Sequence, residues 1–227
     1  MDTAFTHLHL HTQYSLLDGA IRIDDLLDKC KEYNMDSVAI TDHGAMYGAL
    51  EFYLKAKAAG IKPIVGCEFY ITPMGRACRD RVPENQRNHL VLLAMNLTGY
   101  QNLMELASIA QLEGFYYKPR IDMEVLKQHN EGLIALTACI KGEIPWLIFK
   151  NDMEGARAKA KEYHDVFGDR LYFELQENGI PEQQQVNNEL KRLAGEMGVK
   201  LVATNDCHYL NKEDAHAHEI LLCIQTG

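Results

Sequence analysis

The segment His7-Leu8-His9-Leu10-His11-Thr12 carries three alternating histidines, and an acid, Asp18, follows seven residues after the last of them. Alternate residues of a β-strand point to the same face. A strand over residues 5–10 would therefore project His9 and His11 together, with both leucines on the other side. Two neighbouring imidazoles at the end of a strand can chelate one metal ion. An ordinary surface or core role explains a single His-x-His pair equally well, so the rest of the chain must decide.

The composition is that of a globular chain. It has 227 residues, enough for one large domain, and 47% hydrophobic residues. The sequence shows neither an apolar stretch long enough to span a bilayer nor a signal-peptide pattern, so no membrane partner is expected. Six scattered cysteines without a Cys-x-x-Cys pair predict free thiols and a cytoplasmic location. The formal net charge of −9 argues against general electrostatic binding of nucleic acid, but it does not exclude a local site.

Short apolar runs alternate with helical patterns along the whole chain. Strands are expected over residues 5–10, 37–41, 63–67, 89–94, 132–137, 171–175 and 200–204. Helices are expected over residues 24–34, 46–59, 99–112, 143–149, 152–167, 181–197 and 212–224. Asp24 is a candidate cap, Gly60 a candidate stop and Pro181 a first-turn residue. Residues 73–88 and 113–122 are expected to be irregular.

Apolar strands that are each followed by a helix indicate a parallel sheet covered on both faces. Seven such units without a break in composition predict one closed or nearly closed α/β barrel. A doubly wound open sheet is the alternative. We expect one domain over residues 1–227.

Side chains that carry chemistry stand near the ends of the expected strands, where α/β barrels place their functional residues. They are His9, His11, Asp42, His43, Glu68, Cys139, Asp206 and His208. His, Asp, Glu and Cys are the side chains that bind Zn, Mn or Fe. Each also has an ordinary interpretation: a turn, a helix cap, a surface acid or a small buried thiol. Their joint occurrence at nearly every strand end favours a metal site.

His89 does not fit this pattern, because it begins its apolar run whereas the other candidates end theirs. In an all-parallel barrel it would lie at the wrong end of the sheet. Three explanations remain open: the strand is reversed, the strand is bent, or His89 lies outside the site.

The motifs His-x-His, Thr-Asp-His-Gly, Gly-x-Glu, a lone His and Asn-Asp-x-His together resemble the polymerase and histidinol phosphatase (PHP) superfamily. The resemblance is closer still to the PHP domains at the N-terminus of bacterial replicative DNA polymerases. It rests on residues 14–19, 60–66, 98–103, 202–206 and 217–221 and covers essentially the whole chain. It implies a distorted (βα)7 TIM-like barrel with a metal site at the C-terminal mouth.

The same resemblance implies a trinuclear metal centre of Zn or Mn, with Fe as a third choice. Its motifs place the nine ligands at His9, His11, Asp18, His43, Glu68, His89, Cys139, Asp206 and His208. Cys139 stands where the phosphatase branch usually has His, and a thiolate also binds Zn. All nine positions can ligate, which favours an active site over a vestigial one. His7 stands where the superfamily often has Asp and is expected, at most, to support a ligand from behind.

The implied activity is a metal-dependent phosphoesterase, a 3′–5′ exonuclease that proofreads DNA 3′ ends for a polymerase. Glu68, Asp206 and His11 are the expected catalytic residues, because clustered metals activate water and the two carboxylates can bridge ions. The polymerase centre itself is expected beyond Gly227, and the rest of that chain and replisome subunits are the expected partners. A small-molecule phosphatase of the histidinol-phosphate type and a non-catalytic, metal-stabilised scaffold are the alternatives.

Two basic stretches are candidates for contacts to a phosphate backbone or to a frayed base. The residues concerned are Arg76, Arg79, Arg81, Arg87, Lys118 and Arg120, with Tyr116 and Tyr117 beside the last two. Solvated loop charge, or packing against a neighbouring domain, explains both stretches at least as well.

Overall fold

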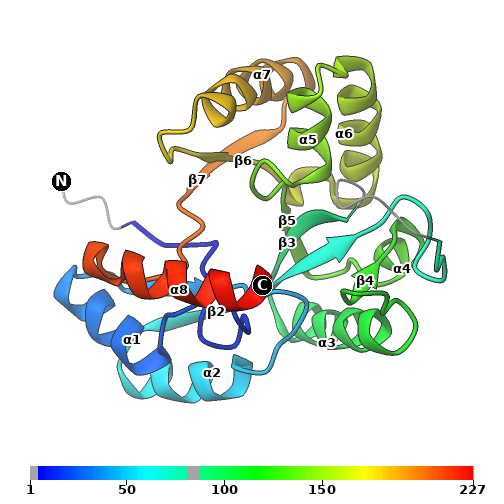
Figure 1. The fold of residues 1–227 in the computed structure, drawn as a ribbon. Helices are drawn as coiled ribbons and strands as arrows, with labels where there is room; N and C mark the ends of the chain where they lie inside the picture. Colours follow the sequence, from blue (N-terminus) through cyan, green and yellow to red (C-terminus); the bar gives the residue numbers. More distant parts are fainter. Residues whose placement is uncertain (1–4, 81–86, 227) are drawn as a thin grey trace.

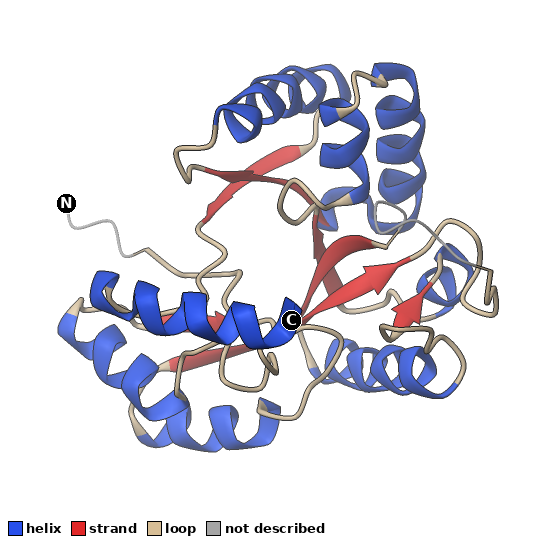
Figure 2. Cartoon of the chain, viewed as in Figure 1, coloured by secondary structure: helices blue, strands red, loops and turns tan. Residues whose placement is uncertain are grey.

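A computed structural model describes residues 5–80 and 87–226, in which helices surround a curled sheet (Figures 1 and 2). The strands are β1 (Ser37–Ile40), β2 (Lys62–Ile71), β3 (Asn88–Ala94), β4 (Arg120–Ile121), β5 (Leu133–Leu136), β6 (Leu171–Gln176) and β7 (Lys200–Thr204). The helices are α1 (Ile23–Glu32), α2 (Ala49–Ala58), α3 (Leu97–Leu112), α4 (Met123–Gln128), α5 (Glu143–Phe149), α6 (Met153–Phe167), α7 (Pro181–Met197) and α8 (Ala215–Thr226). The strand order is β1-β2-β3-β5-β6-β7, and β4 pairs with β2.

The N-terminal histidine segment joins the two edges of this sheet. On one side, the carbonyls of His7 and Leu10 accept hydrogen bonds of 2.8 Å from backbone N–H groups in β1 and just after it. On the other side, His11 N–H donates to the Cys207 carbonyl at 2.8 Å. Residues 5–10 do not form the regular strand that we expected, but they close the curl. The distorted barrel is thereby confirmed, and the open-sheet alternative is wrong.

Strand β3 runs against its neighbours. It pairs antiparallel with β2 and β5, whereas the β1–β2, β5–β6 and β6–β7 pairs are parallel. His89, near the start of β3, lies opposite Tyr70 near the end of β2. The reversed strand therefore brings His89 to the barrel mouth. The expectation of an all-parallel sheet is wrong for β3, and its reversal answers the open question about His89.

Three apolar clusters cover both faces of the barrel wall. The largest packs α3 to α7 against the outside, and a second packs α1 and α2 against β1 and Leu10. The third fills the interior with residues such as Val91 and Leu136, and Leu8 packs against it. The chain bends at His9, so the two leucines of the histidine segment do not share a face as expected.

Several element boundaries differ from those expected. α1 begins at Ile23, and its N-cap residue, Arg22, makes no side-chain capping bond, so Asp24 is a first-turn acid and not the cap. β4 and α4, too short for a periodic signal, lie in and just after the stretch expected to be irregular. Gly60, with φ of 76°, follows α2, and Pro181 opens α7, as expected. Within the described ranges, no helix is long and apolar enough to cross a membrane.

Candidate metal centre

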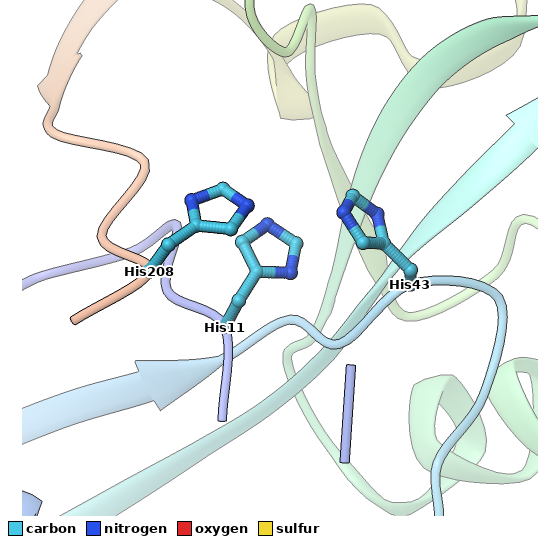
Figure 3. Close-up of side chains that lie close together, drawn as sticks. All are labelled: His11, His43 and His208. Atoms are coloured by element: carbon cyan, nitrogen blue, oxygen red, sulfur yellow. The ribbon is translucent and has the colours of Figure 1, made fainter. Parts of the chain in front are cut away.

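Imidazoles from three separate segments meet at the barrel mouth. Figure 3 shows His11 from the N-terminal segment, His43 from the loop after β1 and His208 from the segment after β7 turned toward one another. The ring centroid of His11 lies 4.1 Å from that of His43 and 4.3 Å from that of His208. His9 lies beside His11, with ring centroids 5.2 Å apart, as the alternating histidines predicted.

Glu68, within β2, is 1% exposed and lies between four imidazoles. Its Oε1 is 3.4 Å from His9 Nε2 and 2.9 Å from His89 Nδ1. Its Oε2 is 3.3 Å from His11 Nε2 and 2.8 Å from His43 Nδ1. Each oxygen thus serves a different pair of histidines, which is the arrangement of a carboxylate that can bridge two cations.

Asp206 approaches two of the same nitrogens, those of His9 and His11. Its Oδ1 lies 3.2 Å from both His9 Nε2 and His11 Nε2. The backbone at Asp206 is left-handed, with φ of 50°, a conformation that Asp and Asn tolerate better than most residues. This turn places the carboxylate over the mouth directly after β7.

Asp18 and Cys139 complete the set of nine expected ligands. Asp18 Oδ2 lies 2.8 Å from His43 Nε2 and 3.7 Å from His208 Nε2. Cys139 Sγ lies 3.9 Å from His89 Nδ1. The structure therefore brings all nine residues into one cluster, and their role as metal ligands stays a prediction.

His218 was not among the expected site residues. It lies on α8, and its Nε2 is 3.9 Å from Asp18 Oδ1, buried, and without a hydrogen-bond partner among the described residues. The sequence placed it in a stretch shared with the resembling family but offered no chemical reason to select it.

Opposed charges and burial set the protonation of the cluster. Burial lowers the pKa of His9, but Asp206, Glu174 and Glu68 raise it well above its ordinary value. Burial lowers the pKa of His11 to about 3. For Glu68, burial acts to raise the pKa, and His89, His9 and His43 hold it well below its usual range. The carboxylate therefore stays ionised among groups that are cationic only when protonated, a setting that favours a bound cation.

Five buried polar atoms in the cluster lack a hydrogen bond of acceptable geometry. They are His9 Nε2, His11 Nε2, His43 Nδ1, Glu68 Oε2 and Asp206 Oδ1. Native proteins pair nearly all such atoms. Two ligands that share a tetrahedral ion with bonds of about 2.1 Å lie about 3.4 Å apart. The separations of 3.2–3.4 Å between Nε2 of His9 and His11 and the oxygens of Glu68 and Asp206 match that value, so these donors fit a metal ion.

Behind the cluster, Asp42 anchors the histidine segment. It accepts hydrogen bonds from Thr12 N–H and Ser15 Oγ, both at 2.7 Å, and the Ser15 hydroxyl lies 3.0 Å from His11 Nδ1. Asp42 is therefore a supporting residue of the site. His7 contacts Cys207 Sγ at 3.6 Å and stays outside the cluster.

Most of the expected substrate-binding arginines have partners within the protein. Arg76 pairs with Glu113, Asp122 and Glu124, and Arg79 donates to backbone carbonyls. Arg120 is 0% exposed and donates to the carbonyls of Gly114, Arg76 and Cys78. The expectation that Arg120 contacts a substrate is therefore wrong, because it is buried as a loop anchor. Arg81 lies outside the described residues.

A cavity of about 610 Å³ opens over the cluster. Arg87, Lys118 and Lys141 supply positive charge to its wall, and α8 contributes His218 and Leu222. In Figure 1, α8 crosses the barrel on the viewer's side. The cavity thus joins the cluster to the two expected basic residues that remain candidates for a substrate contact, Arg87 and Lys118.

Comparisons with known proteins agree with this architecture. Residues 7–178 match the model of the PHP domain. The chain is 49% identical to "DNA polymerase III subunit alpha" of Aquifex aeolicus and 51% identical to that of Thermus aquaticus, over 99% and 98% of its own length. It spans about a fifth of the length of these relatives.

Two solved structures share the fold at low sequence identity. One is a predicted metal-dependent phosphoesterase from Bifidobacterium adolescentis, with a TM-score of 0.60, 12% identity, and coverage of 95% of this chain and 96% of that one. The other is an amidohydrolase from Chromobacterium violaceum, with a TM-score of 0.55, 13% identity and the same coverage. With the family model matched over 172 residues and the motif residues gathered at one barrel mouth, this chain belongs to the PHP domain family.

Proposed function

We propose that this chain is a metal-dependent phosphoesterase that removes nucleotides from DNA 3′ ends as a 3′–5′ exonuclease, within a larger replicative polymerase. The five buried atoms at the barrel mouth that lack a well-formed hydrogen bond support the phosphoesterase part. Membership of the PHP domain family supports hydrolysis. Relatives named as polymerase subunits support DNA as the substrate and the rest of such a polymerase as the partner.

Three overlapping triads support a trinuclear centre: His11, His43 and His208; His9, His11 and Asp206; and His43, Glu68 and His89. Asp18 and Cys139 border them. The mixture of imidazole, carboxylate and thiol suits Zn or Mn, with Fe as a third choice. Such ions, when bound, make hydroxide available near neutral pH and offset charge on the phosphoryl oxygens.

The chain's own residues then bind and orient the substrate. Glu68 and Asp206 hold His9 and His11 in position, and with His11 they are the residues proposed to act at the reacting phosphate. Lys118 and Tyr70 line the cavity together, and Lys118 Nζ lies 5.4 Å from the ring centroid of Tyr70. We propose that Lys118 contacts a phosphate oxygen of a substrate bound in this cavity. Burial raises the pKa of Tyr70, so its phenol keeps a proton to donate.

The experiment is a cleavage assay on 5′-labelled primers that end in a matched or a mismatched 3′ nucleotide. The metal-loaded chain should shorten both from the 3′ end, and the mismatched end faster, because a frayed end costs less to unpair. Binding should weaken as salt rises, since the net charge of −9 leaves only local cations to hold DNA. Chelation should abolish cleavage.

Lys118→Ala should raise the KM for DNA several-fold and spare a small chromogenic phosphoester, because one phosphate contact is lost. Lys127→Ala is the matched control, since Lys127 pairs with Glu162 away from the cavity. Efficient hydrolysis of histidinol phosphate with intact DNA 3′ ends would replace the exonuclease by a small-molecule phosphatase. Metal binding without hydrolysis of either substrate would favour the third alternative, a non-catalytic scaffold that the metal stabilises.

A further inference from the structure

Glu174 lies in β6, directly behind the metal centre, and is not one of the nine expected ligands. It is fully buried, with its Oε1 2.7 Å from His9 Nδ1. The same oxygen accepts hydrogen bonds from Gln176 Nε2 at 3.0 Å and from the Thr204 hydroxyl. The backbone N–H of Glu174 donates to Thr137 Oγ1 at 2.9 Å. The carboxylate is therefore held by side chains of β6 and β7, and the backbone of Glu174 is held by Thr137, just after β5.

This contact decides which nitrogen of His9 faces the site. A carboxylate only accepts hydrogen bonds, so the 2.7 Å contact requires a proton on His9 Nδ1. When the ring is neutral, as metal ligation requires, the lone pair is on His9 Nε2, which faces Glu68 and Asp206 without a well-formed hydrogen bond. The neighbouring His11 has a different support, because its Nδ1 lies against the Ser15 hydroxyl.

We propose that Glu174 is a positioning residue that holds the Nδ1 proton of His9, and thereby presents His9 Nε2 to a divalent metal ion. This inference rests on the proposed metal-dependent function. An outer carboxylate of this kind fixes the ring and makes the ligating nitrogen more basic, so its loss weakens metal binding about 10–100-fold. Glu174 acts through His9 and touches neither metal nor substrate.

The test compares zinc affinity, measured by competition with a chromogenic chelator, for the unchanged chain, Glu174→Gln and Glu143→Gln. Glu143 is the matched control, a buried carboxylate bonded to Tyr163 and Lys159 and not among the nine expected ligands. We expect Glu174→Gln to weaken zinc binding about 10–100-fold. We expect the zinc affinity of Glu143→Gln to stay within about twofold of that of the unchanged chain. The reason is that the side-chain partners of Glu143, Tyr163 and Lys159, are not among the expected ligands.

Long-range ¹H–¹⁵N spectra of the zinc-loaded unchanged chain provide a second readout. His9 should carry its proton on Nδ1. The chemical shift of that proton should be typical of a hydrogen bond, and Glu174→Gln should change it. Thr204→Val removes one donor to Glu174 and should weaken zinc binding by a smaller factor, so the inference stays testable if Glu174→Gln does not fold. Equal zinc affinity in all variants, or a His9 proton on Nε2, would overturn the inference. Absence of zinc binding by the unchanged chain would instead overturn the proposed function.

Discussion

Two buried glutamates have opposite surroundings. Glu143, at the start of α5, accepts a hydrogen bond from Tyr163 at 3.0 Å and pairs with Lys159 at 3.2 Å. Glu68 faces four imidazoles, no lysine or arginine among the described residues forms an ion pair with it, and its Oε2 lacks a well-formed hydrogen bond. The first carboxylate has a permanent cation, and the second has groups that are cationic only when protonated. The charge of Glu143 is neutralised within the protein, as in a structural ion pair. The charge of Glu68 is left for a bound cation to neutralise, as in a metal site.

The largest expected effect comes from Glu68→Gln. This change keeps the shape of the side chain but removes the charge that faces His9, His11, His43 and His89. Metal affinity should fall by more than the roughly 10–100-fold of an outer-shell change, and cleavage should be lost with it. Metal content after gel filtration, measured together with activity, checks this. A variant that keeps a full metal load would break the contrast between Glu68 and Glu143.

Metal removal should have the next largest effect. A ligand that binds only the folded chain stabilises it by about 2.7 kcal/mol at a concentration of 100 Kd. Chelation should therefore lower Tm by several degrees in a chain of this size, at about 2–4 °C per kcal/mol. Calorimetry with and without chelator measures the shift. The same shift in Glu68→Gln as in the unchanged chain would contradict the assignment of Glu68.

Glu143→Gln should lower the free energy of unfolding by about 1–3 kcal/mol, because the buried Tyr163 hydroxyl loses a charged acceptor, whereas Lys159 keeps Glu162. Urea unfolding measures this value in chelator, where the metal centre does not contribute. Metal content should stay equal to that of the unchanged chain. Loss of metal in this variant would remove the distinction between a structural and a functional carboxylate.

The smallest expected effect concerns Asp122, which caps α4. Burial acts to raise the pKa of Asp122, but backbone hydrogen bonds from Arg76 and Val125 and the Arg76 guanidinium lower it below its usual range. A lowered folded-state pKa stabilises the protein above the unfolded value near 3.9, and this stabilisation is lost as pH falls through the folded value. Asp122→Asn should cost about 1 kcal/mol at pH 7 and less at pH 3.

Chelator-treated protein in urea at the two pH values gives this difference. Asp28→Asn is the control, since its side chain is 78% exposed. A cost for Asp122→Asn that is unchanged at pH 3 would contradict the role given to its charge.

Much of the site was readable from the sequence because it is local to strand ends. His9 and His11 follow from the alternation of an extended segment, and His43, Asp206 and His208 come directly after apolar runs. The direction of β3 was not readable, because an apolar run looks the same in either direction. Only the resemblance to the family placed His89 in the site.

The wrong expectation for Arg120 and the omission of Glu174 have one cause. The groups that each side chain contacts come from segments distant in the sequence. Arg120 looks like a surface cation in the sequence. In the structure it is buried, and its guanidinium donates hydrogen bonds to three loop carbonyls. Glu174 was missed, although a single acid within the apolar run of β6 was a usable signal. A buried charge requires a partner, and the sequence could not show that the partner was His9.

Metal analysis of the chain purified without chelators tests the central claim most directly. The five buried atoms of His9, His11, His43, Glu68 and Asp206 that lack a well-formed hydrogen bond predict two or three equivalents of a transition metal, Zn or Mn, per chain. Anomalous diffraction should place these ions between Glu68, Asp206 and the surrounding imidazoles. Protein that carries no metal after chelator-free purification, and takes up none from added Zn or Mn, would contradict the claim.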